Sequence, residues 1–165
     1  MIAQNWLAHR VRRFHTNQHL AHLGQTNADH SHGVASIIAL MHPSPSAELL
    51  KAALWHDAGE RYAGDLPQPF KAEYPDIARQ HSWAEDRLAL RCAPLKPTLT
   101  PDEKAWLKLA DRLEAIMFVA FHRPGLLRRA DWREFVADLM ERARDMGVSD
   151  RVDRALRDIE EEGWV

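Results

Sequence analysis

The sequence predicts an all-α fold, and two observations support this. Apolar residues recur at intervals of three and four along most of the chain, the spacing that places them on one face of a helix. No stretch of alternating apolar and polar residues between turn residues is typical of a strand. A chain of 165 residues can bury one substantial core and is short for two. We therefore expect a single compact domain over residues 1–165, built from about six or seven helices.

The sequence predicts the elements of the N-terminal part from local patterns. A first helix should run from Ile2 to about Phe14, and the polar segment from Thr16 to Asp29 should be a loop or a broken helix. The next helix carries an apolar stripe and ends at a proline-rich turn. The residues of this stripe are Val34, Ile37, Ile38 and Met41.

A third helix should begin near Ser46, and its inward face is unusually polar. Residues at offsets of four, seven, eight and eleven from the first share one face of a helix. This face is expected to hold Leu49, Ala53, His56, Asp57 and Glu60. The third helix would therefore point three polar side chains toward the interior.

Two further helices have clear boundaries. The segment from Pro75 to Arg91 is amphipathic and predicts one helix. The next helix should begin after Thr100, because Thr is a good N-cap and Glu103 stands where a capping box needs an acid. We expect this helix to run to about Phe121.

The last two expected helices follow the same signals. Asp131 with Glu134 repeats the start pattern, Gly147 supplies a stop, and the final helix should span Ser149 to Glu162. The large aromatic residues Trp55, Trp83 and Trp106 are expected in the core rather than as platforms for stacking bases.

The composition excludes several classes of partner. With 22 Lys+Arg against 24 Asp+Glu, the chain has no global field that attracts nucleic acid or an anionic membrane. We expect neither polymeric nucleic acid nor a membrane as partner. The single cysteine, Cys92, excludes an intrachain disulfide and a multi-thiolate zinc site. A reducing compartment fits, so a cytoplasmic location is expected, with no signal peptide or membrane span.

Two residues are placed unusually for a helical core. His30 lies four residues before Val34, on the buried face, whereas His32 lies four before Ser36, on the polar face. Asp111 lies on an apolar face in the middle of its helix. Burying an unpaired carboxylate costs several kcal/mol, so such a residue needs a cation, a hydrogen-bond network or exposure.

The residues His30, His56, Asp57 and Asp111 together form a candidate metal site. Two imidazoles and two carboxylates without sulfur suit a divalent Mn, Fe, Co, Ni or Zn ion better than Mg. A simpler interpretation stays open at this point. One His-Asp pair can occur by chance in a chain with ten histidines, and Asp111 could instead pair with Lys108 or Arg112.

These residues resemble the HD-domain phosphohydrolase superfamily. Its metal is held by a His, a later His-Asp pair and a distant Asp, which is the order found here. The segment HDAGERYAGDLPQPFK, with ADHSHGVA before it and KLADRLEA after it, resembles the small branch of bacterial 5′-deoxynucleotidases and short viral-type, dATPase-like deoxynucleoside triphosphohydrolases. The resemblance covers roughly Arg13 to Ala115. It implies an all-α fold, a divalent metal and cleavage between the 5′ oxygen and the α-phosphorus of a deoxynucleotide.

The resemblance also implies roles for individual residues. Glu60 matches the catalytic acid, and Asp65 matches the acid near the sugar and the attacking water. Arg13 matches a phosphate-binding arginine, with Phe14 where tryptophan is common in relatives. Two basic residues are in register with residues of the family that could neutralise phosphate oxygens. These are Lys71, on a proline-stiffened loop, and Lys108.

The resulting hypothesis is a metal-dependent deoxynucleotide phosphohydrolase, with monophosphates and triphosphates both open as substrates. Relatives of this kind often pair, so a homo-oligomer is compatible with it. The alternative is a non-catalytic helical module that binds nucleotides or a protein through Arg10, Arg12 and Arg13. That alternative predicts no bound transition metal.

Overall fold

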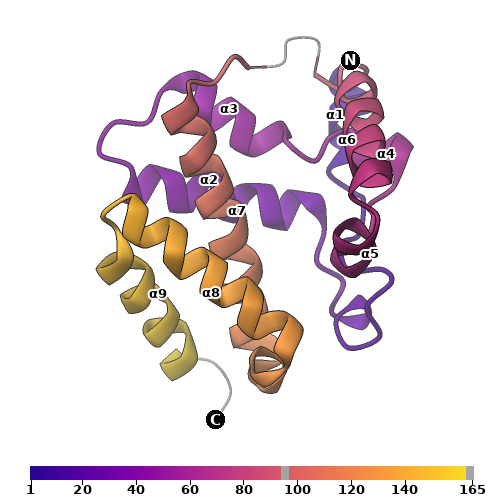
Figure 1. The fold of residues 1–165 in the computed structure, drawn as a ribbon. Coiled ribbons are helices and arrows are strands. Elements are labelled where there is room, and N and C mark those ends of the chain that lie inside the picture. The colour runs from indigo at the N-terminus through magenta and orange to yellow at the C-terminus, as the bar shows by residue number, and fades with distance from the viewer. Residues whose placement is uncertain (94–96, 163–165) are drawn as a thin grey trace. The chain divides into compact units, whose positions relative to one another are not determined.

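A computed structural model describes residues 1–93 and 97–162 and confirms the all-α prediction (Figure 1). The described residues form no strand, only an isolated antiparallel bridge between Arg12 and Thr26. Seven helices have seven or more residues, as expected, while α4 and α5 have four and six. The helices are α1 Ile2–Ala8, α2 Asn27–Met41, α3 Ala47–Trp55, α4 Glu60–Ala63, α5 Gln68–Glu73, α6 Pro75–Ala89, α7 Pro101–His122, α8 Ala130–Asp145 and α9 Ser149–Glu162, with 3-10 turns η1 Ala21–Leu23 and η2 Pro124–Arg128.

The chain divides into two compact units. The first unit comprises Met1–His32 and Lys51–Thr98, and the second comprises Gly33–Leu50 and Leu99–Val165. The boundaries fall within α2 and α3, so each of these helices contributes to both units. The expectation of a single domain stays a prediction. Within the described part of the chain, no helix combines the length and the apolar character needed to span a membrane.

The first helix is shorter than predicted. It ends at Ala8 rather than near Phe14, because the main chain that follows pairs with a distant segment instead of continuing the helix. The amide of Arg13 donates to the carbonyl of Gln25 at 2.9 Å, and the amide of Asn27 donates to the carbonyl of Val11 at 2.9 Å. These hydrogen bonds use the groups that helical continuation would need.

The third helix is also shorter than predicted, so His56, Asp57 and Glu60 do not share one helix. α3 ends at Trp55, residues 56–59 form a turn, and α4 begins at Glu60. The ring of His56 bonds to the carbonyl of Ala53 at 2.9 Å, and the amide of Glu60 donates to the carbonyl of Asp57 at 3.1 Å. The three-residue spacing of the second bond is that of a tight turn rather than of an α-helix. We call residues 56–59 the HD turn.

In the first unit, α6 forms the surface against which shorter elements pack. α4 and α5 both contact α6, and α1 contacts α4 (Figure 1). The closest approach is at Gly59, at the end of the HD turn, where an added Cβ would lie 2.3 Å from the carbonyl oxygen of Glu85 on α6. Only a residue without a side chain fits there.

The later helices follow the local signals closely. α6 ends two residues before the expected Arg91. The capping box at the start of α7 is confirmed, with the Glu103 amide donating to Thr100 Oγ1 at 3.2 Å and the Thr100 amide to Glu103 Oε2 at 2.8 Å. The stop at Gly147 is confirmed by its φ of 68°, and α9 has the expected bounds.

One start signal was misread. α8 begins at Ala130 with Arg129 at the N-cap, so Asp131 lies inside the first turn instead of capping it. The Asp131 carboxylate accepts from Arg129 Nε at 3.4 Å and therefore interacts with a side chain rather than with the helix amides. An acid in the first turn still stabilises the positive end of the helix dipole.

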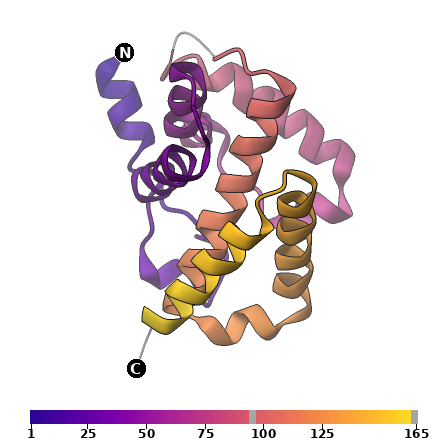
Figure 2. The same ribbon diagram turned by 90° about the vertical axis from the view of Figure 1, so that its left-hand side faces the viewer.

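In the second unit, α7 is the helix on which α8 and α9 pack, as the two ribbon views show (Figures 1 and 2). The buried residues of α7 are all apolar, which explains why two other helices can pack on it. Fully buried side chains of this unit include Val34, Ile38, Leu49, Leu109, Leu113, Ile116, Val119, Leu139 and Val152. The predicted apolar stripe on α2 is thereby confirmed at Val34, Ile38 and Met41, which are all buried.

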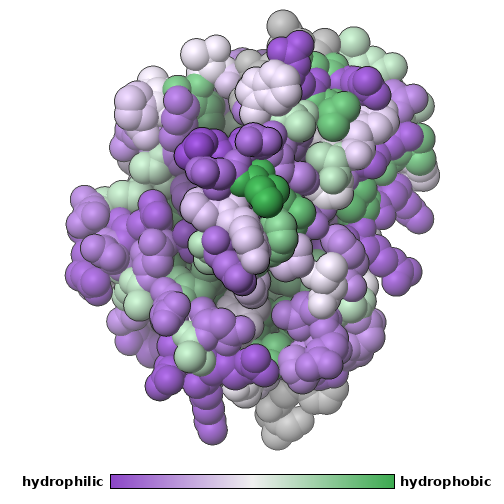
Figure 3. Space-filling view, turned by 45° about the vertical axis from the view of Figure 1, so that its right-hand side comes forward, coloured by the Kyte–Doolittle hydropathy of each residue, from purple (hydrophilic) through white to green (hydrophobic). Residues whose placement is uncertain are grey.

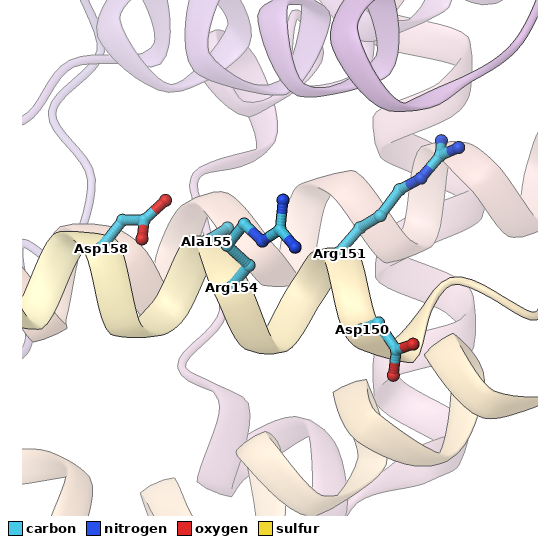
Figure 4. A pocket seen from close by; sticks show the side chains of 5 residues that line it. All are labelled: Asp150, Arg151, Arg154, Ala155 and Asp158. Carbon is cyan, nitrogen blue, oxygen red and sulfur yellow. The ribbon is translucent and has the colours of Figure 1, made fainter.

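A hollow of about 390 Å³ runs along α9 (Figure 4). Arg151 and Arg154 extend to one side of the helix and Asp150 to the other. Arg151 Nη1 donates to the carbonyl of Met41 at 2.8 Å, so it ties α9 to the end of α2. None of the residues that the sequence indicates for chemistry lines this hollow.

The expectation for the tryptophans is only partly met. Trp106 is buried with 7% exposure, Trp55 is half-buried, and Trp83 is 64% exposed. Trp83 lies on the outer side of α6, with the guanidinium of Arg87 5.1 Å from its ring centroid. The surface view shows other apolar residues, in green, exposed between hydrophilic ones (Figure 3). The core prediction for Trp83 was therefore wrong.

Gly59→Ala should destabilise the protein by about 1–3 kcal/mol, because the added methyl group forces the α6 backbone away from the HD turn. The measurement is urea denaturation followed by circular dichroism. Gly125→Ala is the matched control, since an added Cβ there meets no atom within 4 Å. It should change the free energy of unfolding by less than about 0.5 kcal/mol. Equal stability of the two variants would contradict the close contact at Gly59.

Candidate metal centre

Three donor side chains meet in the first unit. Nε2 of His30 lies 3.2 Å from Nε2 of His56, and the carboxylate of Asp57 lies 3.6 Å from the first nitrogen and 3.2 Å from the second. His30 comes from α2, and the other two residues come from the HD turn. His30 is fully buried and His32 is exposed, which confirms the faces of the helix on which the two histidines were predicted to lie.

The ring of His56 is oriented for a metal. Its Nδ1 lies 2.9 Å from the carbonyl of Ala53, and a carbonyl can only accept, so Nδ1 carries the proton. Nε2 then presents its lone pair toward His30 and Asp57. A histidine ligand held through its other nitrogen by a backbone carbonyl is a common arrangement around metals. Two imidazole nitrogens and a carboxylate oxygen at these distances suit a divalent transition metal.

The structure also brings Arg13 and Phe14 to this cluster. Arg13 Nη1 donates to Asp57 Oδ2 at 2.6 Å, and the guanidinium lies 5.5 Å from the ring centroid of Phe14. Phe14 has a φ of 55°, in the left-handed region that costs energy for a residue with a side chain. The arginine therefore contacts the same carboxylate as the two histidines.

Glu60 is a buried acid beside these donors. It is 8% exposed, and Asn27 Nδ2 donates to its Oε2 at 2.9 Å. Burial and the negative charges of Asp57 and Asp65 raise the pKa of Glu60 to about 8, against the opposing effects of the Asn27 hydrogen bond and of Arg13. A carboxyl group with this pKa holds its proton at neutral pH and can donate it.

Asn27 is a site residue that the sequence did not reveal to us. It is almost completely buried, and its Nδ2 also donates to the carbonyl of Asp57 at 3.3 Å. It thus joins the start of α2 to the HD turn and to the first residue of α4. Its position three residues before His30, one helical turn away, was the available signal.

Asp65 and Lys71 form an ion pair on the same side of the first unit. Lys71 Nζ lies 3.0 Å from Asp65 Oδ1. Lys71 is on α5 rather than on a loop, which corrects the sequence-based placement. Burial opposes the charge of Lys71, but the carboxylates of Asp65, Glu85 and Glu60 outweigh it and raise the pKa of the ammonium group. Lys71 therefore stays charged.

Glu85 on α6 is the second residue that the sequence did not reveal. Burial, followed by the charge of Asp57, raises the pKa of Glu85 to about 7, while Lys71 acts in the opposite direction. Its Oε2 lies 3.9 Å from Nδ1 of His81. Nothing in the sequence separates Glu85 from the exposed acids of this amphipathic helix, because its burial depends on the contact with Gly59.

Asp111 and Lys108 lie on α7, in the second unit. Lys108 Nζ is 3.5 Å from Asp111 Oδ2, one of the two pairings that the simpler interpretation allowed. Arg112 Nε lies 2.9 Å from Asp138 Oδ2, and the charge of Asp111 also acts on this guanidinium. The roles of Asp111 as a ligand and of Lys108 as a phosphate contact stay predictions.

After removal of metal with a chelator, Glu60→Gln should change how stability depends on pH. The carboxyl of Glu60 has an ordinary pKa of 4.5 and a folded-state pKa of about 8, so its stabilising contribution is full below 4.5 and is lost as pH rises through about 8. The variant should gain on the order of 1–3 kcal/mol over the wild type between these limits. Glu85 is present in both proteins, so its effect on the pH dependence cancels when the two free energies of unfolding are subtracted. Parallel unfolding curves from pH 4 to 9 would contradict the assignment.

One of the comparisons with known proteins identified a family. A family model described as HD domain matches residues 8–163. Comparisons with curated proteins and with solved structures found no match. An HD domain with the two histidines and the aspartate described above indicates a metal-dependent phosphohydrolase. Since the match extends over nearly the whole sequence, the chain belongs to the HD domain family.

Proposed function

We propose that the protein is a metal-dependent phosphohydrolase that cleaves the bond between the 5′ oxygen and the α-phosphorus of 2′-deoxynucleotides. The products would be a deoxynucleoside and either phosphate, from a dNMP, or triphosphate, from a dNTP. The observation that supports this best is the meeting of His30, His56 and Asp57 beside Glu60, a buried acid that is protonated at neutral pH. A metal site and a proton donor are the two components that such a hydrolysis needs.

His30, His56 and Asp57 would hold the metal, with Asp111 as the fourth ligand. The assignment of Asp111 rests on the order of the residues along the chain, which is that of HD-domain enzymes. The nitrogen-rich donor set favours Co, Mn, Zn, Fe or Ni. When bound, the ion would lower the pKa of a water molecule and polarise a phosphate oxygen.

The remaining residues have complementary roles in the proposed reaction. Arg13 would bind a phosphate oxygen, because its guanidinium lies against the carboxylate of Asp57, beside the proposed metal. Lys71 and Lys108 would offset further phosphate charge. Phe14 would lie against the sugar or base.

Proton transfer would involve two acids. As a new bond forms between the attacking water and phosphorus and the bond to the 5′ oxygen breaks, Glu60 would give its proton to the departing 5′ oxygen. Asp65 would orient the attacking water and the sugar. The deoxynucleoside would leave neutral, and the phosphate would carry the added oxygen.

The protein should hydrolyse deoxynucleotides when supplied with Mn²⁺ or Co²⁺. The test incubates it with a panel of dNMPs and dNTPs and identifies the products by chromatography. Release of phosphate from dNMPs or of triphosphate from dNTPs is expected, and the product decides between the two substrate classes. No turnover of any nucleotide would overturn the proposal.

His30→Ala and Asp57→Ala should remove metal and activity together, with activity lower by at least about 100-fold. Metal content is measured by elemental analysis of the purified proteins. His32→Ala is the matched control, because it removes an exposed imidazole two residues along the same helix. This variant should keep its metal content and its activity. Asp111→Asn should lower the metal content if Asp111 is a ligand, and an unchanged content would exclude that role.

A further inference from the structure

Asn27 makes two hydrogen bonds through a single side-chain nitrogen. Its Nδ2 donates to the main-chain carbonyl of Asp57 at 3.3 Å and to Oε2 of Glu60 at 2.9 Å. A carbonyl oxygen can only accept, so the atom that faces Asp57 is the amide nitrogen and not the amide oxygen. Both hydrogens of this nitrogen are therefore used inside the protein, one on the HD turn and one on the buried acid.

The backbone of Asn27 is fixed as well. Asn27 is the first residue of α2, and its main-chain amide donates to the carbonyl of Val11 at 2.9 Å. The residue is 1% exposed. A rotation of its side chain would break the hydrogen bonds to Asp57 and to Glu60 together. The place of the Glu60 carboxyl is therefore set by a donor that is itself held at both ends.

The oxygen of the Asn27 amide indicates which end of the side chain is useful. Oδ1 is buried and has no hydrogen-bond partner among the described residues. A buried acceptor without a donor costs stability, and such atoms are uncommon in folded proteins. An amide at this position is thus unfavourable at its oxygen and favourable at its nitrogen, which is the atom that contacts Glu60.

We propose that Asn27 is a positioning residue, which holds Oε2 of Glu60 as an acceptor so that Oε1 is the oxygen that donates to the leaving group. The proposal rests on the proposed function, in which Glu60 is the proton donor. A carboxyl oxygen that accepts from an amide nitrogen is not the one that carries the proton, so the proton lies on Oε1. The same nitrogen holds the carbonyl of Asp57, which keeps the acid in one orientation relative to the HD turn.

The orientation of Glu60 affects one part of the reaction. The oxygen of water forms a bond to phosphorus, the bond from phosphorus to the 5′ oxygen breaks, and the proton of Oε1 passes to the 5′ oxygen. The proton that the attacking water loses balances it, so Glu60 is protonated again after each turnover. Without the amide of Asn27 the carboxyl can turn, and proton transfer to the leaving group becomes slower. Binding of the substrate does not require this transfer.

Asn27→Leu tests the role, because it removes the amide and keeps a side chain of similar size. With Mn²⁺ and the deoxynucleotide that the wild type hydrolyses, kcat should fall about 10- to 100-fold and KM should change less than about 3-fold. The same nucleotide with sulfur in place of the 5′ oxygen is the critical comparison, since a thiolate leaves without a proton. On this analogue kcat should stay within about 3-fold of the wild type. An equal loss on both substrates would show a general disturbance of the site and would overturn the proposal.

Asn5→Leu is the matched control, because it makes the same change at a half-buried position of α1. It should alter kcat on either substrate by less than about 2-fold. Circular dichroism checks folding, and Asn27→Ala replaces Asn27→Leu if that variant does not fold.

A second measurement needs no turnover. In Zn²⁺-loaded protein, nuclear magnetic resonance should show the Nδ2 hydrogens of Asn27 exchanging with solvent at least about 10-fold more slowly than those of Asn5, and Glu60→Ala should remove part of this protection. Exchange as fast as that of Asn5, or no effect of Glu60→Ala, would overturn the proposal. If no nucleotide is hydrolysed, the proposed function fails, while the exchange rates still decide whether Asn27 holds Glu60.

Discussion

The carboxylate of Asp57 is shared by three side chains, and much of the first unit serves to keep it in place. It lies within 3.6 Å of two imidazole nitrogens and accepts a hydrogen bond of 2.6 Å from Arg13. A largely buried carboxylate without such partners would cost several kcal/mol. The HD turn presents this group at the end of α3, and the absence of a side chain at Gly59 lets α6 support the turn from behind. The same few contacts therefore fix the position of the Asp57 carboxylate and balance its charge.

The site places carboxyl groups with different properties next to one another. Asp57 contacts a guanidinium, Asp65 contacts an ammonium group, and the more buried Glu60 and Glu85 have raised pKa values. Environments that separate the pKa values of neighbouring acids allow one to donate a proton while another stays charged. Here burial is what raises the two glutamate pKa values, because it is the largest contribution to the shift of both Glu60 and Glu85. The packing of α4 and α6 is thus a chemical as well as a structural feature.

Local signals in the sequence predicted what local hydrogen bonds determine. The capping box of Thr100, the stop at Gly147 and the buried face of His30 depend on residues within about one helical turn, and all are confirmed. The early end of α1 depends on pairing between segments more than ten residues apart, and the periodicity of residues 2–14 contains no trace of it. Asn27 and Glu85 were missed for the same reason, since their roles arise from contacts with the HD turn. The metal ligands could be proposed because their residue types are unusual at inward positions.

The pairing of the segment around Arg13 has a consequence for how this chain can vary. Arg13 is positioned by main-chain hydrogen bonds to the region of Gln25 and Asn27, which do not depend on the identity of the side chains between them. Exposed positions of the intervening segment can therefore accept many substitutions, whereas Leu20 is buried and is constrained by packing. A single inserted or deleted residue between Val11 and Arg13 would instead shift the pairing by one position. Since successive side chains of an extended segment point to opposite sides, the guanidinium would then turn away from Asp57.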